Sequence, residues 1–345
     1  MRPSGLGSST IVNNSPIFIV GSPRSGTGLL RDLLRAHPRI TFPGESHFIP
    51  LFYRAYGDPE TERDARRLGQ LVLGLNWVKR WGLDLEPSSF RDCRSFRDVI
   101  VLLYEAWADK EGKERWGDKT PQYVTEIGLL RTIFPDCQLI HIYRDGRDVA
   151  LSILAAGFGP QNLYTAARQW RYFVRTARAA GAAQPSGTYL DVRYEDLLNA
   201  PEETMRGVLE FLGEPFESSV LKPDFLERFV RPPIIGQPRR AYASRTEIVA
   251  DNWGKWKSQM GAEERLLFES VAGDLLTELG YETEGKVRPL SSAEEFRWKA
   301  HHLLLWPFQK LNRRQKSPST AWIMLCAQLR CLWKRLGRQP TRSSG

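Results

Sequence analysis

The stretch Gly21-Ser22-Pro23-Arg24-Ser25-Gly26-Thr27-Gly28 decides the fold, because of what stands on either side of it. Before it, residues 17–20 form a short β-branched and aromatic run that predicts a buried strand. After it, leucines recur at helical spacing, at Leu29, Leu30, Leu33 and Leu34. Strand, glycine-rich loop and helix in this order form the frame of a P-loop. In that frame, backbone N–H groups and the helix dipole favour a bound anion.

The loop departs from that of nucleoside triphosphatases at two positions. A triphosphatase would carry Lys at position 27 and a Mg²⁺-binding hydroxyl at position 28, where this chain has Thr27 and Gly28. Mg²⁺-dependent phosphoryl transfer is therefore disfavoured. Arg24 instead stands inside the loop, where its guanidinium can bind two oxygens of one anion. We expect a metal-free anion cradle formed by Arg24, Ser25, Gly26, Thr27 and Gly28; the alternative is a turn that only connects strand to helix.

A second strand–turn–helix unit follows a predicted buried strand at residues 139–143. It places Arg144 at the strand end and Ser152 about two helical turns further on. An Arg and a hydroxyl that converge in this way suit a phosphate monoester, although a surface ion pair is the alternative for such a turn. Further strands predicted at 40–42 and 188–192 alternate with helices. The pattern favours a parallel sheet covered on both faces, with ligands at its carboxyl edge.

Together the two units resemble the sulfotransferases that use 3′-phosphoadenylyl sulfate (PAPS), with the first as the 5′-phosphosulfate loop and the second as the 3′-phosphate motif. The resemblance extends from about Pro16 to Tyr281 and is nearest to the tyrosylprotein sulfotransferases and their bacterial relatives. It implies an α/β, P-loop-like three-layer fold with a central parallel sheet flanked by helices, PAPS as donor and no metal. The other segments that carry it are residues 36–38, 44–45, 192–198, 201–203 and 253–256.

The resemblance also implies catalytic roles. Sulfuryl transfer needs a base for the acceptor's proton and cations near the bridging oxygen. Glu45 matches the catalytic glutamate of the tyrosylprotein enzymes, and Lys119 matches a lysine near the bridging oxygen, with Arg24 assisting. His47 is the alternative base, because histidine titrates near neutral pH. Without the resemblance, Glu45 and Lys119 would be read as solvated loop charges.

Three more residues complete the predicted nucleotide site. Tyr194 would either offer its ring to the adenine or belong to the core. Lys255, and with weaker support Ser244, would bind the nucleotide. Lys255 stands where many relatives carry Arg, which keeps a cation but loses a two-pronged donor.

The positive charge of the chain belongs to its last segment. The formal net charge is +9, and residues 286–345 contain thirteen Lys or Arg and two Asp or Glu, a net of +11 that leaves −2 for the first 285 residues. We therefore expect no nucleic-acid partner for the main domain. The expected units are a flexible stretch at 1–15, a sulfotransferase domain at 16–285 and a basic amphipathic helical tail at 286–345.

The tail carries one apolar helical stripe, which either packs on the domain or lies on a membrane surface. Its members are Trp322, Leu325, Cys326, Leu329, Leu332, Trp333 and Leu336. Neither an apolar leader nor a membrane-spanning run is visible, so we expect a cytoplasmic protein, with the inner membrane surface as a candidate contact.

The acceptor would be a hydroxyl of a sugar, lipid, small metabolite or tyrosine. The alternatives are a P-loop nucleotide or small-molecule kinase and a non-catalytic protein that binds membranes or polyanions.

Overall fold

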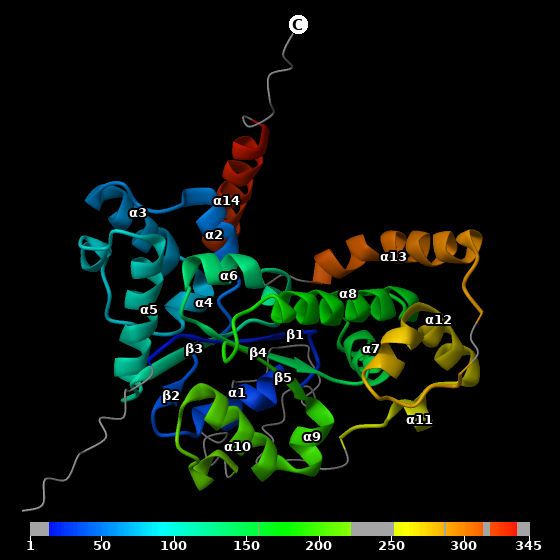
Figure 1. Ribbon diagram of the computed structural model, residues 1–345. Coiled ribbons are helices and arrows are strands. Elements are labelled where there is room, and N and C mark those ends of the chain that lie inside the picture. The colour runs from blue at the N-terminus through cyan, green and yellow to red at the C-terminus, as the bar shows by residue number, and fades with distance from the viewer. Residues whose placement is uncertain (1–13, 158, 222–251, 286–287, 313–317, 337–345) are drawn as a thin grey trace, which may run out of the picture.

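Five parallel strands form one sheet at the centre of the molecule, in the order β2-β3-β1-β4-β5. The structure, a computed structural model, describes residues 14–157, 159–221, 252–285, 288–312 and 318–336 (Figure 1). The strands are β1 (Ile17–Gly21), β2 (Ile40–Thr41), β3 (Arg115–Lys119), β4 (Gln138–Tyr143) and β5 (Tyr189–Arg193). Helices cover both faces of the sheet, which confirms the predicted α/β three-layer fold.

Alternate side chains of β1 enter two separate apolar clusters. Phe18 and Val20 belong to the first cluster, and Ile17 and Ile19 to the second. The first contains residues of α2 (Ile49–Tyr56), α3 (Glu62–Leu73), α4 (Asn76–Lys79), η1 (Pro87–Phe90), α5 (Phe96–Lys110), η2 (Pro121–Thr125) and α6 (Ile127–Ile133). The second contains residues of α1 (Thr27–Arg35), α9 (Tyr194–Asn199), α10 (Pro201–Leu212) and η3 (Ser218–Leu221). The period-2 alternation of a strand thus builds both cores at once.

A third apolar cluster lies beside the carboxyl end of β4. It joins α7 (Gly146–Ala156), α8 (Leu163–Ala182), α11 (Trp256–Gln259) and α12 (Ala262–Glu278). Trp170 of α8 is buried in this cluster, and its Nε1 donates to the carbonyl oxygen of Arg144 at 3.0 Å. This bond connects α8 to the predicted phosphate-binding arginine, which directly follows β4.

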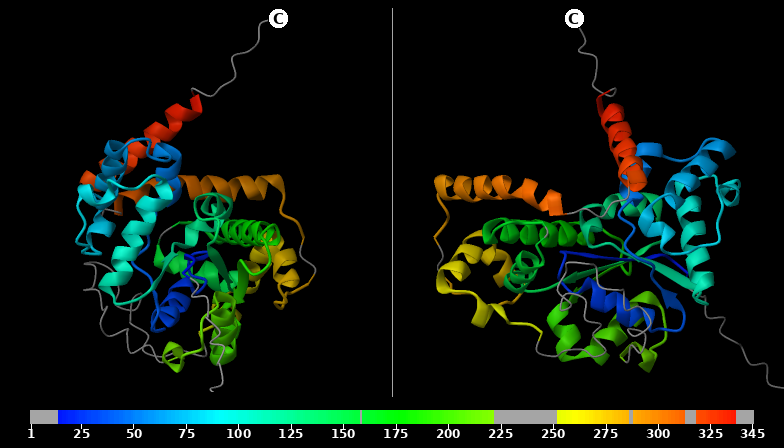
Figure 2. Two further views of the ribbon diagram at one scale, coloured as in Figure 1. Left: turned by 60° about the vertical axis from the view of Figure 1, so that its left-hand side comes forward. Right: turned by 180° about the vertical axis from the view of Figure 1, so that it is seen from behind.

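The tail forms two helices, α13 (Ser292–Asn312) and α14 (Pro318–Leu336), and α14 packs on α2 (Figures 1 and 2). Met324 and Ala327 of α14 enter the first apolar cluster, and Thr320 accepts a hydrogen bond from the backbone N–H of Asn76 at 2.8 Å. The packed face is not the predicted stripe, whose described large apolar members lie exposed. Among the described residues, no helix is long and apolar enough to cross a membrane.

Candidate functional site

The loop between β1 and α1 is held in a conformation that only particular residues tolerate. Gly26 has φ 96°, and a Cβ on it would lie 2.2 Å from the Tyr194 ring. Arg24 has φ 74°, and a non-glycine residue in this region costs about 1 kcal/mol or more. Thr27 and Gly28 begin α1, so their N–H groups are among those that a helix leaves without internal partners. The loop therefore presents backbone donors at a helix N-terminus.

A buried hydroxyl in the same loop has no hydrogen-bond partner in the described part of the chain. The side chain of Ser25 is fully buried, and its Oγ makes no hydrogen bond to any other residue that the structure describes. Buried hydroxyls in native proteins are nearly always bonded, so an unsatisfied one in an anion-binding loop points to a bound ligand as its partner.

The two predicted phosphate-binding units meet in space. Arg24 Nε donates to Ser152 Oγ at 3.0 Å, although the two residues are 128 positions apart. Ser152 lies in α7, the helix that follows Arg144. The end of β1 and the end of β4 are adjacent in the sheet, which is why their loops converge.

Arg144 is buried and only partly satisfied. Its Nη2 donates to Asp148 Oδ2 at 3.1 Å and to the carbonyl oxygen of Asn252 at 2.8 Å. Its guanidinium carbon lies 4.6 Å from the centre of the Tyr194 ring. Its Nε finds no acceptor among the described residues. The bonds of Nη2 thus fix the direction of this arginine, and Nε remains available for a ligand.

The segment at residues 252–256 is pinned to this arginine. Asp148 accepts from the backbone N–H of Gly254 at 2.7 Å and of Trp256 at 3.0 Å. Asn252 donates to the Tyr194 hydroxyl at 2.6 Å, and its side-chain oxygen accepts from Lys255 Nζ at 2.7 Å. Lys255 is therefore brought to the same cluster as Arg144, as the predicted nucleotide site requires. Ser244 lies outside the described residues.

Tyr194 is a member of the second apolar cluster and is almost fully buried. Its ring lies against Gly26 on one side and beneath the guanidinium of Arg144 on another. Its ring thus lies in the apolar core of this structure, and its contact with the adenine stays a prediction. The residue connects the loop after β1 to the arginine at the end of β4.

Glu45, Lys119 and His47 form a second group of candidate functional side chains. Lys119 Nζ donates to Glu45 Oε1, and His47 Nε2 lies 2.9 Å from Glu45 Oε2. Both oxygens of the carboxylate are therefore engaged, one by each of the other two predicted catalytic side chains. His47 has φ 56°, a left-handed conformation that is uncommon outside functional sites and turns.

The pKa values of Glu45 and Lys119 are shifted by burial and by the neighbouring side chains of this group. Burial alone would raise the pKa of Glu45, but the hydrogen bond from His47 and the charge of Lys119 outweigh it and lower the pKa to about 2. Burial lowers the pKa of Lys119, and the carboxylate of Glu45 opposes that effect. Near neutral pH Glu45 is thus an ionised carboxylate that accepts a hydrogen bond from Lys119.

A buried polar network holds the loop that carries Glu45 and His47. Ser46 lies between them, and its backbone N–H donates to Thr120 Oγ1 at 3.1 Å. The Tyr123 hydroxyl lies 2.7 Å from Ser46 Oγ and accepts from the backbone N–H of Ile49 at 3.0 Å. The loop is thus fixed to the segment that follows β3, the strand that ends at Lys119.

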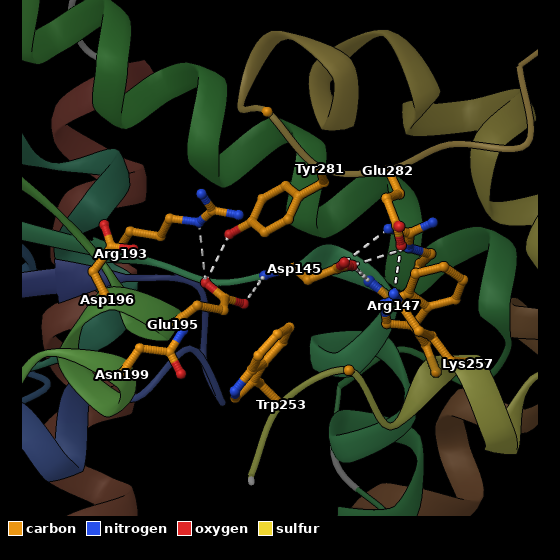
Figure 3. Close-up of a pocket in the computed structure, with 13 residues that line it drawn as sticks. Asp145, Arg147, Arg193, Glu195, Asp196, Asn199, Trp253, Lys257, Tyr281 and Glu282 are labelled. Carbon is orange, nitrogen blue, oxygen red and sulfur yellow. Dashed lines mark hydrogen bonds and ion pairs between the residues drawn. The ribbon is translucent and has the colours of Figure 1, made fainter. Parts of the chain in front are cut away.

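Asp145 and Arg147, in the turn that follows β4, line a hollow of about 280 Å³ (Figure 3). Arg147 donates to both oxygens of Asp145, at 3.1 and 2.8 Å, and its guanidinium lies 3.4 Å from the centre of the Trp256 ring. The Tyr281 hydroxyl donates to Glu195 at 2.9 Å. Arg147 with Asp145, and Lys257 with Glu282, are thus charge pairs within the wall. None of the described residues that line the hollow is a predicted catalytic or donor-binding residue.

Two residues of this site were not predicted from the sequence. Asp148 and Asn252 touch no expected ligand group but orient Arg144, and Asn252 also orients Tyr194 and Lys255. The position of Asn252 next to Trp253 is the only sequence signal that could have indicated it.

Comparison with known proteins agrees with the geometry. Residues 16–218 match the sulfotransferase family. A putative protein-tyrosine sulfotransferase of Caenorhabditis briggsae is 25% identical over 212 residues, 59% of this chain and 68% of the relative. The nodulation protein NoeE of Sinorhizobium fredii is 27% identical over 289 residues, 77% of this chain and 65% of that protein.

The solved structures point the same way. The sulfotransferase domain from the Synechococcus PCC 7002 olefin synthase aligns with a TM-score of 0.55 and 25% identity, covering 76% of this chain and 94% of that domain. The matched part of the chain covers 30%, 68% and 51% of the lengths of the first three curated relatives. With more than half of the chain matched by the family and the fold shared with solved members, the chain belongs to the sulfotransferase family.

Proposed function

We propose that this sulfotransferase takes its sulfuryl group from PAPS and transfers it to a hydroxyl of the acceptor. Residues 24–28 and the N-terminus of α1 would hold the 5′-phosphosulfate, and Arg144 with Ser152 would hold the 3′-phosphate. The observation that carries the proposal is a pair of buried donors without partners among the described residues, Ser25 Oγ and Arg144 Nε. Both lie where the resemblance puts an anionic group, so the residues fit a donor with phosphates at both ends.

The chemistry would run through Glu45 and Lys119. As the acceptor oxygen bonds to sulfur, the bond from sulfur to the 5′-phosphate oxygen breaks. Glu45 would take the acceptor's proton, and Lys119 would donate to the phosphate oxygen that leaves. The contact between the two side chains supports this division of roles, because both reacting oxygens would lie within reach of one ion pair.

His47 is the alternative base, and its contact with Glu45 supports a shared role. When Lys119 turns to the leaving oxygen, Glu45 loses one of the interactions that lower its pKa and becomes a better proton acceptor. Glu45→Gln should then reduce sulfuryl transfer more than His47→Gln does. The opposite order would assign the base to His47.

The acceptor would be a hydroxyl of a tyrosine, sugar, lipid or small metabolite; several relatives are named as protein-tyrosine sulfotransferases. We also propose that the chain works in the cytoplasm. The free thiols of Cys93 and Cys137, both buried, support a reducing compartment.

Titration calorimetry with 3′,5′-adenosine bisphosphate (the spent donor), without metal, tests the donor site. Wild type should bind it, and Ser25→Ala should bind it about 10- to 100-fold more weakly, as expected for the loss of a hydrogen bond to a charged group. Because Ser25 Oγ has no partner among the described residues, the substitution should leave the free energy of unfolding nearly unchanged.

Two further variants sharpen the result. Arg144→Ala should abolish the binding, although it also leaves Asp148 without its guanidinium partner and requires a check of folding. Ser186→Ala, at an exposed position, is the matched control and should bind as wild type does. If folded wild type does not bind the bisphosphate, or if Ser25→Ala binds it as tightly as wild type, the proposed donor site is wrong.

A further inference from the structure

Helix α14 has two opposite faces with different environments. Thr320, Met324 and Ala327 pack against the body of the molecule and are at most 9% exposed. The outward face is also apolar, and its large side chains are between 44% and 76% exposed. They recur at spacings of 3, 4, 3 and 1, which is one side of a helix: Trp322, Leu325, Leu329, Leu332 and Trp333.

The outward face is not needed for packing. The opposite face already connects α14 to the body, through Thr320 to Asn76 and through the Sγ of Cys331, which lies 3.6 Å from the carbonyl oxygen of Leu51. A single exposed leucine needs no explanation, but a row of two tryptophans and three leucines along one helix marks an interaction surface.

Basic side chains lie beside this surface. Arg330 lies over the Tyr56 ring, 5.1 Å from its centre, and Lys334 Nζ lies 3.5 Å from the carbonyl oxygen of Arg54. Arg330 and Arg67 are both close enough to Tyr56 to oppose, by their charge, the rise in its pKa that burial causes. The whole segment from residue 286 carries a net charge of +11. Tryptophan and leucine flanked by arginine and lysine complement an anionic lipid surface, whereas a second copy would bring like charges together.

We propose that the outward face of α14 docks on an anionic lipid surface. Helix α2 connects the docking site to the candidate catalytic group of Glu45, His47 and Lys119. Helix α2, on which α14 packs, begins two residues after His47, and Trp77 of α4 contacts the His47 ring at 6.2 Å between ring centres. Docking would therefore hold the loop of Glu45 and His47 near the lipid headgroups, where it would meet acceptors anchored in or adsorbed on a membrane. This last consequence rests on the proposed function, but the docking itself does not.

Vesicle co-sedimentation of the full chain at low salt tests the docking. Wild type should bind vesicles of phosphatidylcholine with phosphatidylglycerol, and should bind phosphatidylcholine alone far more weakly. The double variant Leu329→Gln/Trp333→Gln should bind the anionic vesicles at least about tenfold more weakly, because each large apolar side chain that leaves water contributes a factor of about ten. Both positions are exposed, so the variant should unfold at the temperature of wild type.

The matched control is Leu266→Gln, an exposed leucine of α12 outside the surface, which should bind as wild type does. Failure of wild type to bind anionic vesicles, or equal binding by the double variant, would overturn the proposal. Sedimentation velocity without lipid tests whether the face binds a second copy of the chain instead. A wild-type dimer that the double variant abolishes would assign the face to that second copy and would also overturn the proposal. Binding of 3′,5′-adenosine bisphosphate, measured on the same samples, reports separately on the donor site.

Discussion

The hydroxyl of Tyr123 holds the loop of Glu45 and His47, and its removal has a calculable cost. Tyr123→Phe deletes one oxygen and creates almost no cavity. The backbone N–H of Ile49, a fully buried donor 3.0 Å from that oxygen, loses the acceptor, which costs about 1–3 kcal/mol. Ser46 Oγ loses a 2.7 Å bond but keeps Thr120 Oγ1 at 3.4 Å, so its share is about 0.5–1 kcal/mol.

We therefore expect Tyr123→Phe to lower the free energy of unfolding by about 1.5–4 kcal/mol. Urea denaturation measures this as a lower midpoint with an unchanged m-value. Tyr172→Phe is the control, because Tyr172 is exposed and should change the midpoint little. A destabilisation below about 0.5 kcal/mol would refute the idea that this hydroxyl anchors the loop, because surface substitutions alone reach that size.

Three further predictions concern the same chain. The pKa of Glu45 is lowered from 4.5 to about 2, so its stabilising effect is present above pH 4.5 and lost as the pH falls towards 2; Glu45→Gln should flatten the dependence of stability on pH in that window, which urea melts would show. Met324→Ala should lower the free energy of unfolding by about 2–5 kcal/mol, because Met324 is buried. Leu329→Ala, on the outward face of α14, should lower it by less than about 0.5 kcal/mol, and equal urea midpoints for the two variants would contradict this difference. Gly26→Ala puts a Cβ 2.2 Å from the Tyr194 ring and should lower both melting temperature and bisphosphate affinity; calorimetry identical to wild type would argue against the strained loop.

The strands that could be predicted from the sequence are those whose buried side chains are apolar. Strands β1 and β4 are recognisable because each is a β-branched and aromatic run next to a glycine or arginine turn. Strand β3 was not predicted, because its residues Arg115 and Asp118 are charged. Arg115 is fully buried, but it donates hydrogen bonds to Glu214 and to the carbonyl oxygen of Leu212. Both acceptors lie about a hundred residues further along the chain. A single sequence does not reveal such distant compensation.

Site residues could be predicted where they belong to a short sequence motif that is typical of anion binding. Arg24 and Ser152 belong to recognisable strand–turn–helix units, and the structure brings them to 3.0 Å. The roles of Glu45 and Lys119 were predicted from the resemblance alone, and their contact with each other was not predicted. Asn252 was missed because it contacts Arg144 and Tyr194, which lie 108 and 58 residues away in the sequence. For the tail, the sequence left open whether the apolar stripe packs on the domain or lies on a membrane surface, and in the structure the opposite face of α14 packs on the body of the molecule. A stripe of tryptophan and leucine is the more hydrophobic face of α14, but Met324 and Ala327 are the residues small or flexible enough to fit against α2.

The bond between Thr320 and Asn76 joins positions 244 residues apart, and this has a consequence for how the chain is made. A ribosome adding about 5–20 residues per second completes α4 roughly 12–50 s before it reaches the threonine. During that interval the sides of α2 and α4 that α14 will cover stay open to water, to a chaperone or to another nascent chain. Closing so long a loop is entropically costly, so α14 should dock last and late, after the sheet has assembled. The final step in folding of this sulfotransferase would then be the arrival of the same helix that carries its outward tryptophans.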